Sequence, residues 1–287
     1  MSSPSVRYFH HAASGTLTYV VADPETARAA VVDPVLGFSI VSGRTDPAPV
    51  DEIVDYLTAE NLALEWILET HAHADHLSGA QLLKDKVGGR VAIGEGIRDV
   101  QAHFARVFNL PSCFAPDGSQ FDHLFGDGEV FQLGSLVCRA LATPGHTSDG
   151  LTYVVGDAAF VGDTLFSPVG GTARCDFPGG DAALLFDSIQ KILSLPSATR
   201  LFLCHDYPKE GRELRWETSI DEQRASNIHV GNETDRQTFV ERRTTRDAEL
   251  SLPAMILPAI QVNIRAGALP PADDNGVSYL RIPLDQL

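Results

Sequence analysis

His71-Ala72-His73-Ala74-Asp75-His76 is the stretch of this 287-residue chain that says most about its fold and its chemistry. Four side chains that can bind a metal lie within six residues, directly after the apolar run at 64–68. Imidazoles bind most first-row transition metals, and a carboxylate adds negative charge. A solvated polar turn is the alternative, but a strand that ends in such a cluster places its side chains at the edge of a sheet. We therefore expect the cluster to hold metal.

Outward from this stretch, short apolar runs alternate with helical patterns. The first series contains strands at 16–21, 29–32, 64–69 and 90–93 and helices at 50–61 and 77–86. The second contains strands at 129–133, 136–142, 151–155, 159–161 and 201–204 and a helix at 181–194. This alternation predicts an α/β domain over residues 1–212, built of two strand-rich halves with helices outside. A helical and loop-rich C-terminal extension, packed on that domain, is expected over residues 213–287.

Composition limits the classes of function. Apolar residues make up 44% of the chain and charged residues 21%, which is typical of a globular protein with a substantial core. The 22 basic and 38 acidic residues give a net charge of −16, which argues against a nucleic-acid-binding surface. No run of about 18 apolar residues and no secretory signal are visible, so no membrane association is expected. Four scattered cysteines without a CxxC pair favour reduced thiols and a cytoplasmic location.

Three further potential ligands each follow an apolar run. His146 lies in Thr143-Pro144-Gly145-His146-Thr147 after a strand, Asp163 ends the run 160–162, and His205 ends the run 201–204. A single histidine after a strand is more often structural than ligating. Together with the opening cluster, however, these positions predict that all the ligands converge on one edge of the sheets.

At this point the chain resembles the metallo-β-lactamase superfamily. The matching residues occur in the family's order over roughly residues 10–210; they are His71-x-His73-x-Asp75-His76, Gly145-His146, Gly162-Asp163 and His205. The resemblance implies an αββα sandwich with metal at the sheet edge. It says less about the reaction, because one fold supports many chemistries.

The residues at two positions argue against two branches of the superfamily that the chain resembles. The common class of true β-lactamases carries cysteine where Asp163 stands, and di-iron flavoproteins usually carry glutamate where His73 stands. Glyoxalase II and persulfide dioxygenases remain. The segment 166–177, the triplet His205-Asp206-Tyr207 and the stretch 258–263 resemble the persulfide dioxygenase branch.

This resemblance implies one Fe(II) per chain, held by His71, His146 and Asp163. Two imidazoles and one carboxylate form a facial triad with open positions for a persulfide and O2. The expected substrate is glutathione persulfide or a similar small persulfide, and the products are sulfite and the free thiol. Four more residues would lie around the iron or complete a second metal position; they are His73, Asp75, His76 and His205.

Alternatives stay open for the reaction and for the substrate contacts. A dinuclear Zn or Fe site would make the protein a thioester hydrolase of glyoxalase II type, and a metal-bearing regulator without turnover is a third hypothesis. Arg174 and Tyr207 are the candidate catalytic and substrate-binding side chains. The planar guanidinium of Arg174 suits a carboxylate of the substrate, and the phenol of Tyr207 can donate a hydrogen bond near the metal. A structural salt bridge for Arg174 and core packing for Tyr207 are the alternatives. The C-terminal extension either shapes the pocket or forms a homodimer contact.

Overall fold

Two six-stranded sheets dominate the computed structural model, which describes residues 3–208 and 211–286. In the first sheet, two antiparallel pairings are followed by three parallel ones. Its strands, in spatial order, are β1 (Ser5–His11), β2 (Thr16–Ala22), β3 (Arg28–Val32), β6 (Ala63–Leu68), β8 (Arg90–Gly94) and β9 (His123–Phe125).

The second sheet is antiparallel except for the parallel pair β13–β14. Its strands, in spatial order, are β10 (Val130–Leu133), β11 (Leu136–Ala142), β12 (Leu151–Val155), β13 (Ala158–Phe160), β14 (Arg200–Phe202) and β15 (Glu217–Ser219). A small third sheet contains β5 (Arg44–Asp46), β4 (Val35–Ser39) and β7 (Leu77–Ser78).

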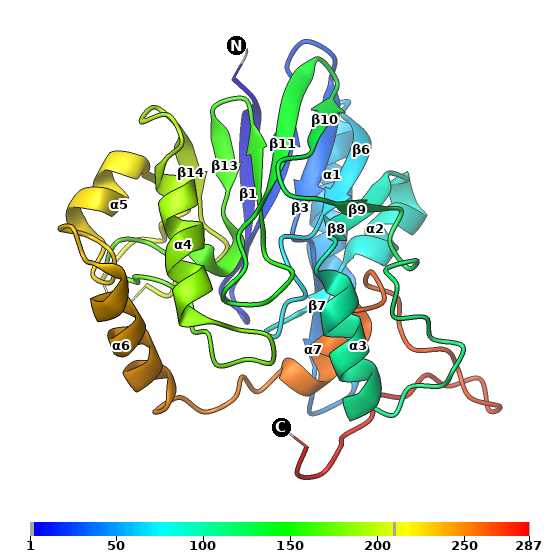
Figure 1. Cartoon of the computed structure of the whole chain (residues 1–287). Coiled ribbons are helices and arrows are strands. Elements are labelled where there is room, and N and C mark those ends of the chain that lie inside the picture. Colours follow the sequence, from blue (N-terminus) through cyan, green and yellow to red (C-terminus); the bar gives the residue numbers. More distant parts are fainter. Residues whose placement is uncertain (1–2, 209–210, 287) are drawn as a thin grey trace.

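Helices cover the outer face of each large sheet (Figure 1). On the first sheet lie α1 (Ala48–Ala59), α2 (Ala80–Val87), α3 (Ile97–Val107) and α7 (Ile256–Asn263). On the second lie α4 (Ala182–Leu193), α5 (Ile220–Ser226) and α6 (Arg236–Asp247). The four layers are helix, sheet, sheet and helix, so the predicted αββα sandwich is confirmed.

Strand β2 shows why the sheets stack. Successive side chains of a strand point to opposite faces. Leu17 and Tyr19 pack into the core between the sheets, whereas Val20 and Ala22 pack under the helices, and all four are buried. Tyr19 also crosses to the second sheet, where its hydroxyl donates to the carbonyl of Leu203 at 2.6 Å.

The structure differs from the sequence-based prediction at several places. Helix α3 and the strands β1, β4, β5 and β9 were not predicted. The helix expected at 77–86 begins only at Ala80, because Leu77 and Ser78 pair with β4. The C-terminal region, expected to be helical and loop-rich, also supplies β15, which completes the second sheet beside β14. A strand of three residues is too short to show a period of two. No helix of the described residues is long and apolar enough to cross a membrane.

Candidate metal centre

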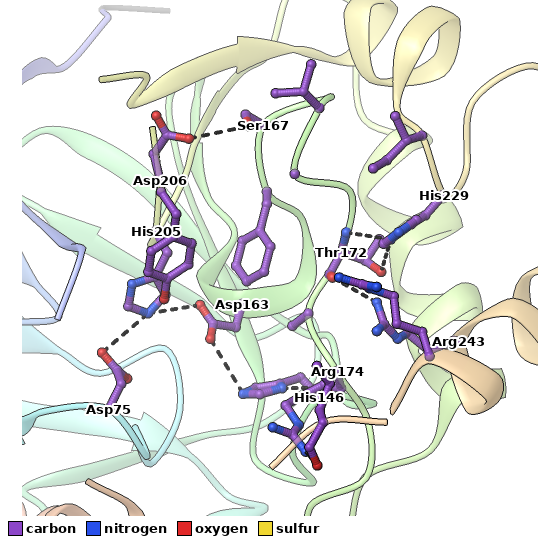
Figure 2. Close-up of a pocket in the computed structure, with 18 of the residues that line it drawn as sticks. Asp75, His146, Asp163, Ser167, Thr172, Arg174, His205, Asp206, His229 and Arg243 are labelled. Atoms are coloured by element: carbon purple, nitrogen blue, oxygen red, sulfur yellow. Dashed lines mark hydrogen bonds and ion pairs between the residues drawn. The ribbon is translucent and has the colours of Figure 1, made fainter. Parts of the chain in front are cut away.

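All the predicted ligands meet at one edge of the two sheets. The loop after β6 supplies the cluster at 71–76, and His146 follows β11. Asp163 lies in the short helix η1 (Gly162–Thr164) after β13, and His205 follows β14. Figure 2 shows Asp75, His146, Asp163 and His205 turned toward one another. The convergence expected from strand ends is therefore present.

His71, His146 and Asp163 form a set that one metal ion could bind. One donor atom from each lies within 4.8 Å of the other two. The Oδ2 atom of Asp163 is 3.9 Å from Nε2 of His71 and 3.6 Å from Nε2 of His146. Two ligands that each bind an ion at about 2.1 Å lie at most about 4.2 Å apart, so these separations fit a shared ion.

Unpartnered buried atoms in this set support the same conclusion. Nε2 of His71 and Oδ1 of Asp163 are buried and have no hydrogen-bond partner. In both histidines the Nδ1 atom has a partner within the protein. Nδ1 of His146 donates to the carbonyl of Arg174 at 2.7 Å, and Nδ1 of His71 lies 3.0 Å from Oγ1 of Thr70. Buried polar atoms rarely lack a partner, and fixing one ring nitrogen directs the other to a metal. The residues fit a bound cation.

A second group lies beside the first. Oδ2 of Asp75 accepts hydrogen bonds from Oγ1 of Thr16 and from Nδ1 of His76, both at 3.0 Å. Nε2 of His76 is buried without a partner. His205 lies between the two carboxylates, with its Nε2 3.4 Å from Oδ1 of Asp163 and 3.6 Å from Oδ2 of Asp75. This group can hold a second ion or donate hydrogen bonds toward the first site.

Two buried carboxylates lie close to the ring of His73. Its Nε2 lies 3.0 Å from Oδ1 of Asp33 and 3.5 Å from Oε2 of Glu69, which leaves Nδ1 facing Oδ1 of Asp75 at 4.0 Å. Burial raises the pKa of both Asp33 and Glu69. Neither residue was predicted from the sequence. Asp33 ends an apolar strand just as Asp163 does, so the same signal would have found it.

The ligand loop is also held from distant parts of the chain. Oδ2 of Asp149 accepts from the backbone N–H of Ala72 at 2.8 Å. The side-chain amide of Asn263, at the end of α7, donates to the carbonyls of His73 at 2.8 Å and His76 at 2.9 Å. Its Oδ1 accepts from the backbone N–H of Ser78 at 2.8 Å. The C-terminal region therefore supports the candidate metal centre directly.

Burial sets the charge state of the central imidazoles. It lowers the pKa of His71 and His73 well below the usual value, and neighbouring histidines add to the effect. Both rings are therefore neutral near pH 7, which is the form that binds metal. For His205, burial lowers the pKa but Asp163 and Asp75 outweigh it, so its pKa is raised.

A cavity of about 1060 Å³ opens onto this centre. Asp75, His146, Asp163 and His205 are among the residues that line it (Figure 2). Phe166 adds apolar surface to the lining. Pockets of this size bind small molecules, with apolar walls for contact and a few polar groups for orientation. The centre can therefore be reached by a small-molecule substrate.

Arg174 and Tyr207 both line the cavity. Nε and Nη2 of Arg174 donate to the carboxylate of Asp176, each at 2.6 Å, and Nη1 donates to the carbonyl of Ser251 at 2.6 Å. Tyr207 is 60% exposed and stacks on the His205 ring at 5.6 Å, so it does not pack in the core. Arg174 therefore forms a salt bridge, which was the alternative to its predicted contact with substrate. Contact of Arg174 or Tyr207 with substrate stays a prediction.

Comparison with known proteins gives the following matches. The family model described as the Metallo-beta-lactamase superfamily matches residues 13–205. A protein named Glyoxylase B2 from Dictyostelium discoideum is 47% identical over 98% of this chain and 97% of its own length. The mitochondrial persulfide dioxygenase ETHE1 of Bos taurus is 30% identical over 90% of this chain and 87% of its own length. A beta-lactamase hydrolase-like protein from Agrobacterium fabrum is 49% identical, and the chain spans 65% of its length.

Among solved structures, the crystal structure of ETHE1 from Myxococcus xanthus superposes with a TM-score of 0.73 and 29% identity. The match covers 92% of this chain and 100% of that one. Because residues 1–212 are only about three quarters of the chain, the match extends into the C-terminal region.

Proposed function

The chain belongs to the metallo-beta-lactamase superfamily, and within it we propose that the protein is an iron-dependent persulfide dioxygenase. The reaction consumes a persulfide, O2 and water, and it releases the free thiol, sulfite and two protons. The four electrons that reduce O2 come from the terminal sulfur of the persulfide. His71, His146 and Asp163 hold one Fe(II) per chain in this proposal.

One observation carries the proposal, namely the contrast between the two carboxylates of the centre. Oδ2 of Asp75 already accepts two hydrogen bonds within the protein, whereas Oδ1 of Asp163 accepts none. A buried carboxylate oxygen without a hydrogen-bond donor is the one that a cation would stabilise most, whereas Oδ2 of Asp75 already has two partners. Asp163 therefore acts as a ligand, and Asp75 positions His76 and His205. The 30% identity to a persulfide dioxygenase over 90% of this chain supports the proposed function.

When bound, Fe(II) supplies redox chemistry that a zinc ion cannot, and the triad leaves coordination positions for sulfur and oxygen. The protein's own residues do the rest. The carbonyl of Arg174 fixes the His146 ring through its 2.7 Å hydrogen bond. His205, whose Nε2 lies 3.4 Å from Oδ1 of Asp163, lies beside that carboxylate without a hydrogen bond to it.

The cavity walls restrict water around the reacting sulfur. Phe177 packs edge-on against the His146 ring at 5.1 Å, and Phe166 lies 6.2 Å from the His205 ring centre. Tyr207, which stacks on the His205 ring, is an exposed part of the cavity lining and could contact an incoming substrate. An apolar wall strengthens the electrostatic contacts inside the site.

A thioester hydrolase with two metal ions is the second candidate. The observation that favours it is the unpartnered Nε2 of His76 beside His73, Asp75 and His205, a group that could bind another ion. Two ions held by this group and by His71, His146 and Asp163 would supply the chemistry for hydrolysis of a thioester. The similarity to Glyoxylase B2 supports this alternative.

Metal content and two activities measured on matched variants distinguish the candidates. We expect protein loaded with Fe(II) to hold about one ion per chain, to consume O2 with glutathione persulfide and to leave S-lactoylglutathione intact. Asp163→Asn should lose iron and O2 consumption, whereas Asp75→Asn should keep most of the iron. Two ions per chain in the wild type, with thioester hydrolysis and no O2 consumption, would establish the hydrolase instead.

A further inference from the structure

The outer part of the cavity carries positive charge that the protein does not neutralise. Three of the arginines in its lining face a carboxylate, because Arg174 pairs with Asp176, Arg212 with Asp206 and Arg243 with Asp247. Arg242 and Arg246 also line the cavity. Neither of these two forms an ion pair within residues 3–208 and 211–286. In a chain of net charge −16, two uncompensated cations at a cavity are an unexpected feature.

Arg242 and Arg246 belong to one face of α6. They are four residues apart, so they lie one above the other on the helix. Both are exposed. Nη1 of Arg242 donates to the carbonyls of Ile228 at 2.9 Å and His229 at 3.2 Å, which fixes its guanidinium without cancelling the charge. The two side chains therefore offer several donors to an anion in the cavity.

Helix α6 is fixed relative to the metal centre. Phe239 on its buried face packs against Phe186 of α4 at 5.4 Å. The next turn carries the buried pair Arg243–Asp247, in which Asp247 also accepts from the backbone N–H of Cys175 at 2.8 Å. Cys175 directly follows Arg174, whose carbonyl holds His146. The distance from the arginines to the metal ligands is therefore set by the fold.

The pKa of His229 responds to the positive charges in this part of the cavity. It lines the cavity, and its Nδ1 accepts from the backbone N–H of Thr172 at 3.0 Å. The pKa of His229 is lowered to about 4, first by burial and then by the charges of Arg243, Arg242 and Arg246. The ring is therefore neutral near pH 7, and Arg242 and Arg246 are the cations that remain for a ligand.

We propose that Arg242 and Arg246 bind a carboxylate of the substrate while its sulfur lies at His71, His146 and Asp163. The substrate class is then a small persulfide whose carrier thiol bears a carboxylate remote from the sulfur. That the reacting group is a persulfide rests on the proposed function. The selection of an anionic carrier rests on the two arginines alone.

Binding and turnover test the proposal separately. The probe for binding is S-methylglutathione, which is anionic and cannot react, and its diethyl ester lacks both carboxylates. Calorimetry on the metal-loaded protein should show that Arg246→Gln weakens binding of S-methylglutathione about 3- to 10-fold and that Arg246→Lys restores most of it. The diethyl ester should bind wild type and variant equally weakly. With glutathione persulfide, KM should rise by a similar factor while kcat stays within about twofold.

Arg236→Gln is the matched control. Arg236 lies on the same helix but pairs with Asp187 outside the cavity, so the substitution makes the same change in charge at another place. Equal weakening by Arg236→Gln, or an unchanged affinity in both Arg246→Gln and Arg242→Gln, would overturn the proposal. If no variant consumes O2 but S-methylglutathione still binds in an arginine-dependent way, the dioxygenase function fails and the anionic substrate class stands.

Discussion

The side chain of Asn263 should couple the C-terminal helix to metal binding, although it lies 187 residues from His76 in sequence. Its amide makes three hydrogen bonds to the backbone of the ligand loop and is 4% exposed. A buried neutral hydrogen bond contributes about 0.5–1.5 kcal/mol, so Asn263→Ala should lower the free energy of unfolding by about 1.5–4.5 kcal/mol. Loss of a residue that orients metal ligands typically lowers metal affinity about 10- to 100-fold.

Two measurements and one control separate these effects. Urea unfolding of the metal-free protein gives the change in stability, and competition with a chelator gives the metal affinity. Gln261→Ala is the control, because Gln261 is a buried amide of the same helix that donates to the carbonyls of Leu257 at 2.7 Å and Arg281 at 3.0 Å instead. It should lose stability and keep its metal affinity. If the two variants lose the same metal affinity, or Asn263→Ala loses none, the proposed coupling is wrong.

Three further outcomes are expected. Gly145 has φ of +136°, and an added Cβ would overlap the backbone of Leu185, so Gly145→Ala should displace His146 and lower both thermal stability and metal content; unchanged metal content would contradict this. Because the pKa of His229 is about 4 in the folded state and about 6.5 unfolded, the unfolded state takes up the proton first, and stability should fall by about 3 kcal/mol as the pH drops from about 6.5 to 4. His229→Gln should remove that part of the pH dependence, as urea titrations at a series of pH values would show. Thr16→Val should leave Asp75 short of one hydrogen-bond donor and lower metal affinity less than Asp163→Asn does, which chelator competition can rank.

The two strand-rich halves with helices outside and the position of the ligands could be predicted from local patterns, whereas the αββα layering was implied by the family resemblance. Apolar runs of strand length at 64–68, 159–162 and 201–204 are each followed within three residues by His or Asp, and strand ends meet at sheet edges. The start of α2 was predicted three residues too early, because Leu77 continues the apolar pattern but pairs with β4. A short pairing of this kind depends on a partner 41 residues away in sequence.

The supporting residues of the site could not be predicted, since their roles depend on long-range packing. Nothing near Asn263 in sequence indicates that its amide reaches His73 and His76. Arg174 was expected to face substrate, yet Asp176, two residues away, holds its guanidinium. Arg242 and Arg246 were hidden among the charges of an exposed helix, and only the fold places them on the cavity.

The stoichiometry of the reaction with glutathione persulfide tests the central claim most directly. In a closed cell, O2 consumption, sulfite and released glutathione would be measured together on the iron-loaded protein. The proposed function predicts one O2 consumed for each sulfite and each glutathione formed, with all three abolished in Asp163→Asn. Formation of glutathione without O2 consumption or sulfite would contradict a dioxygenase and leave hydrolysis as the reaction of this centre.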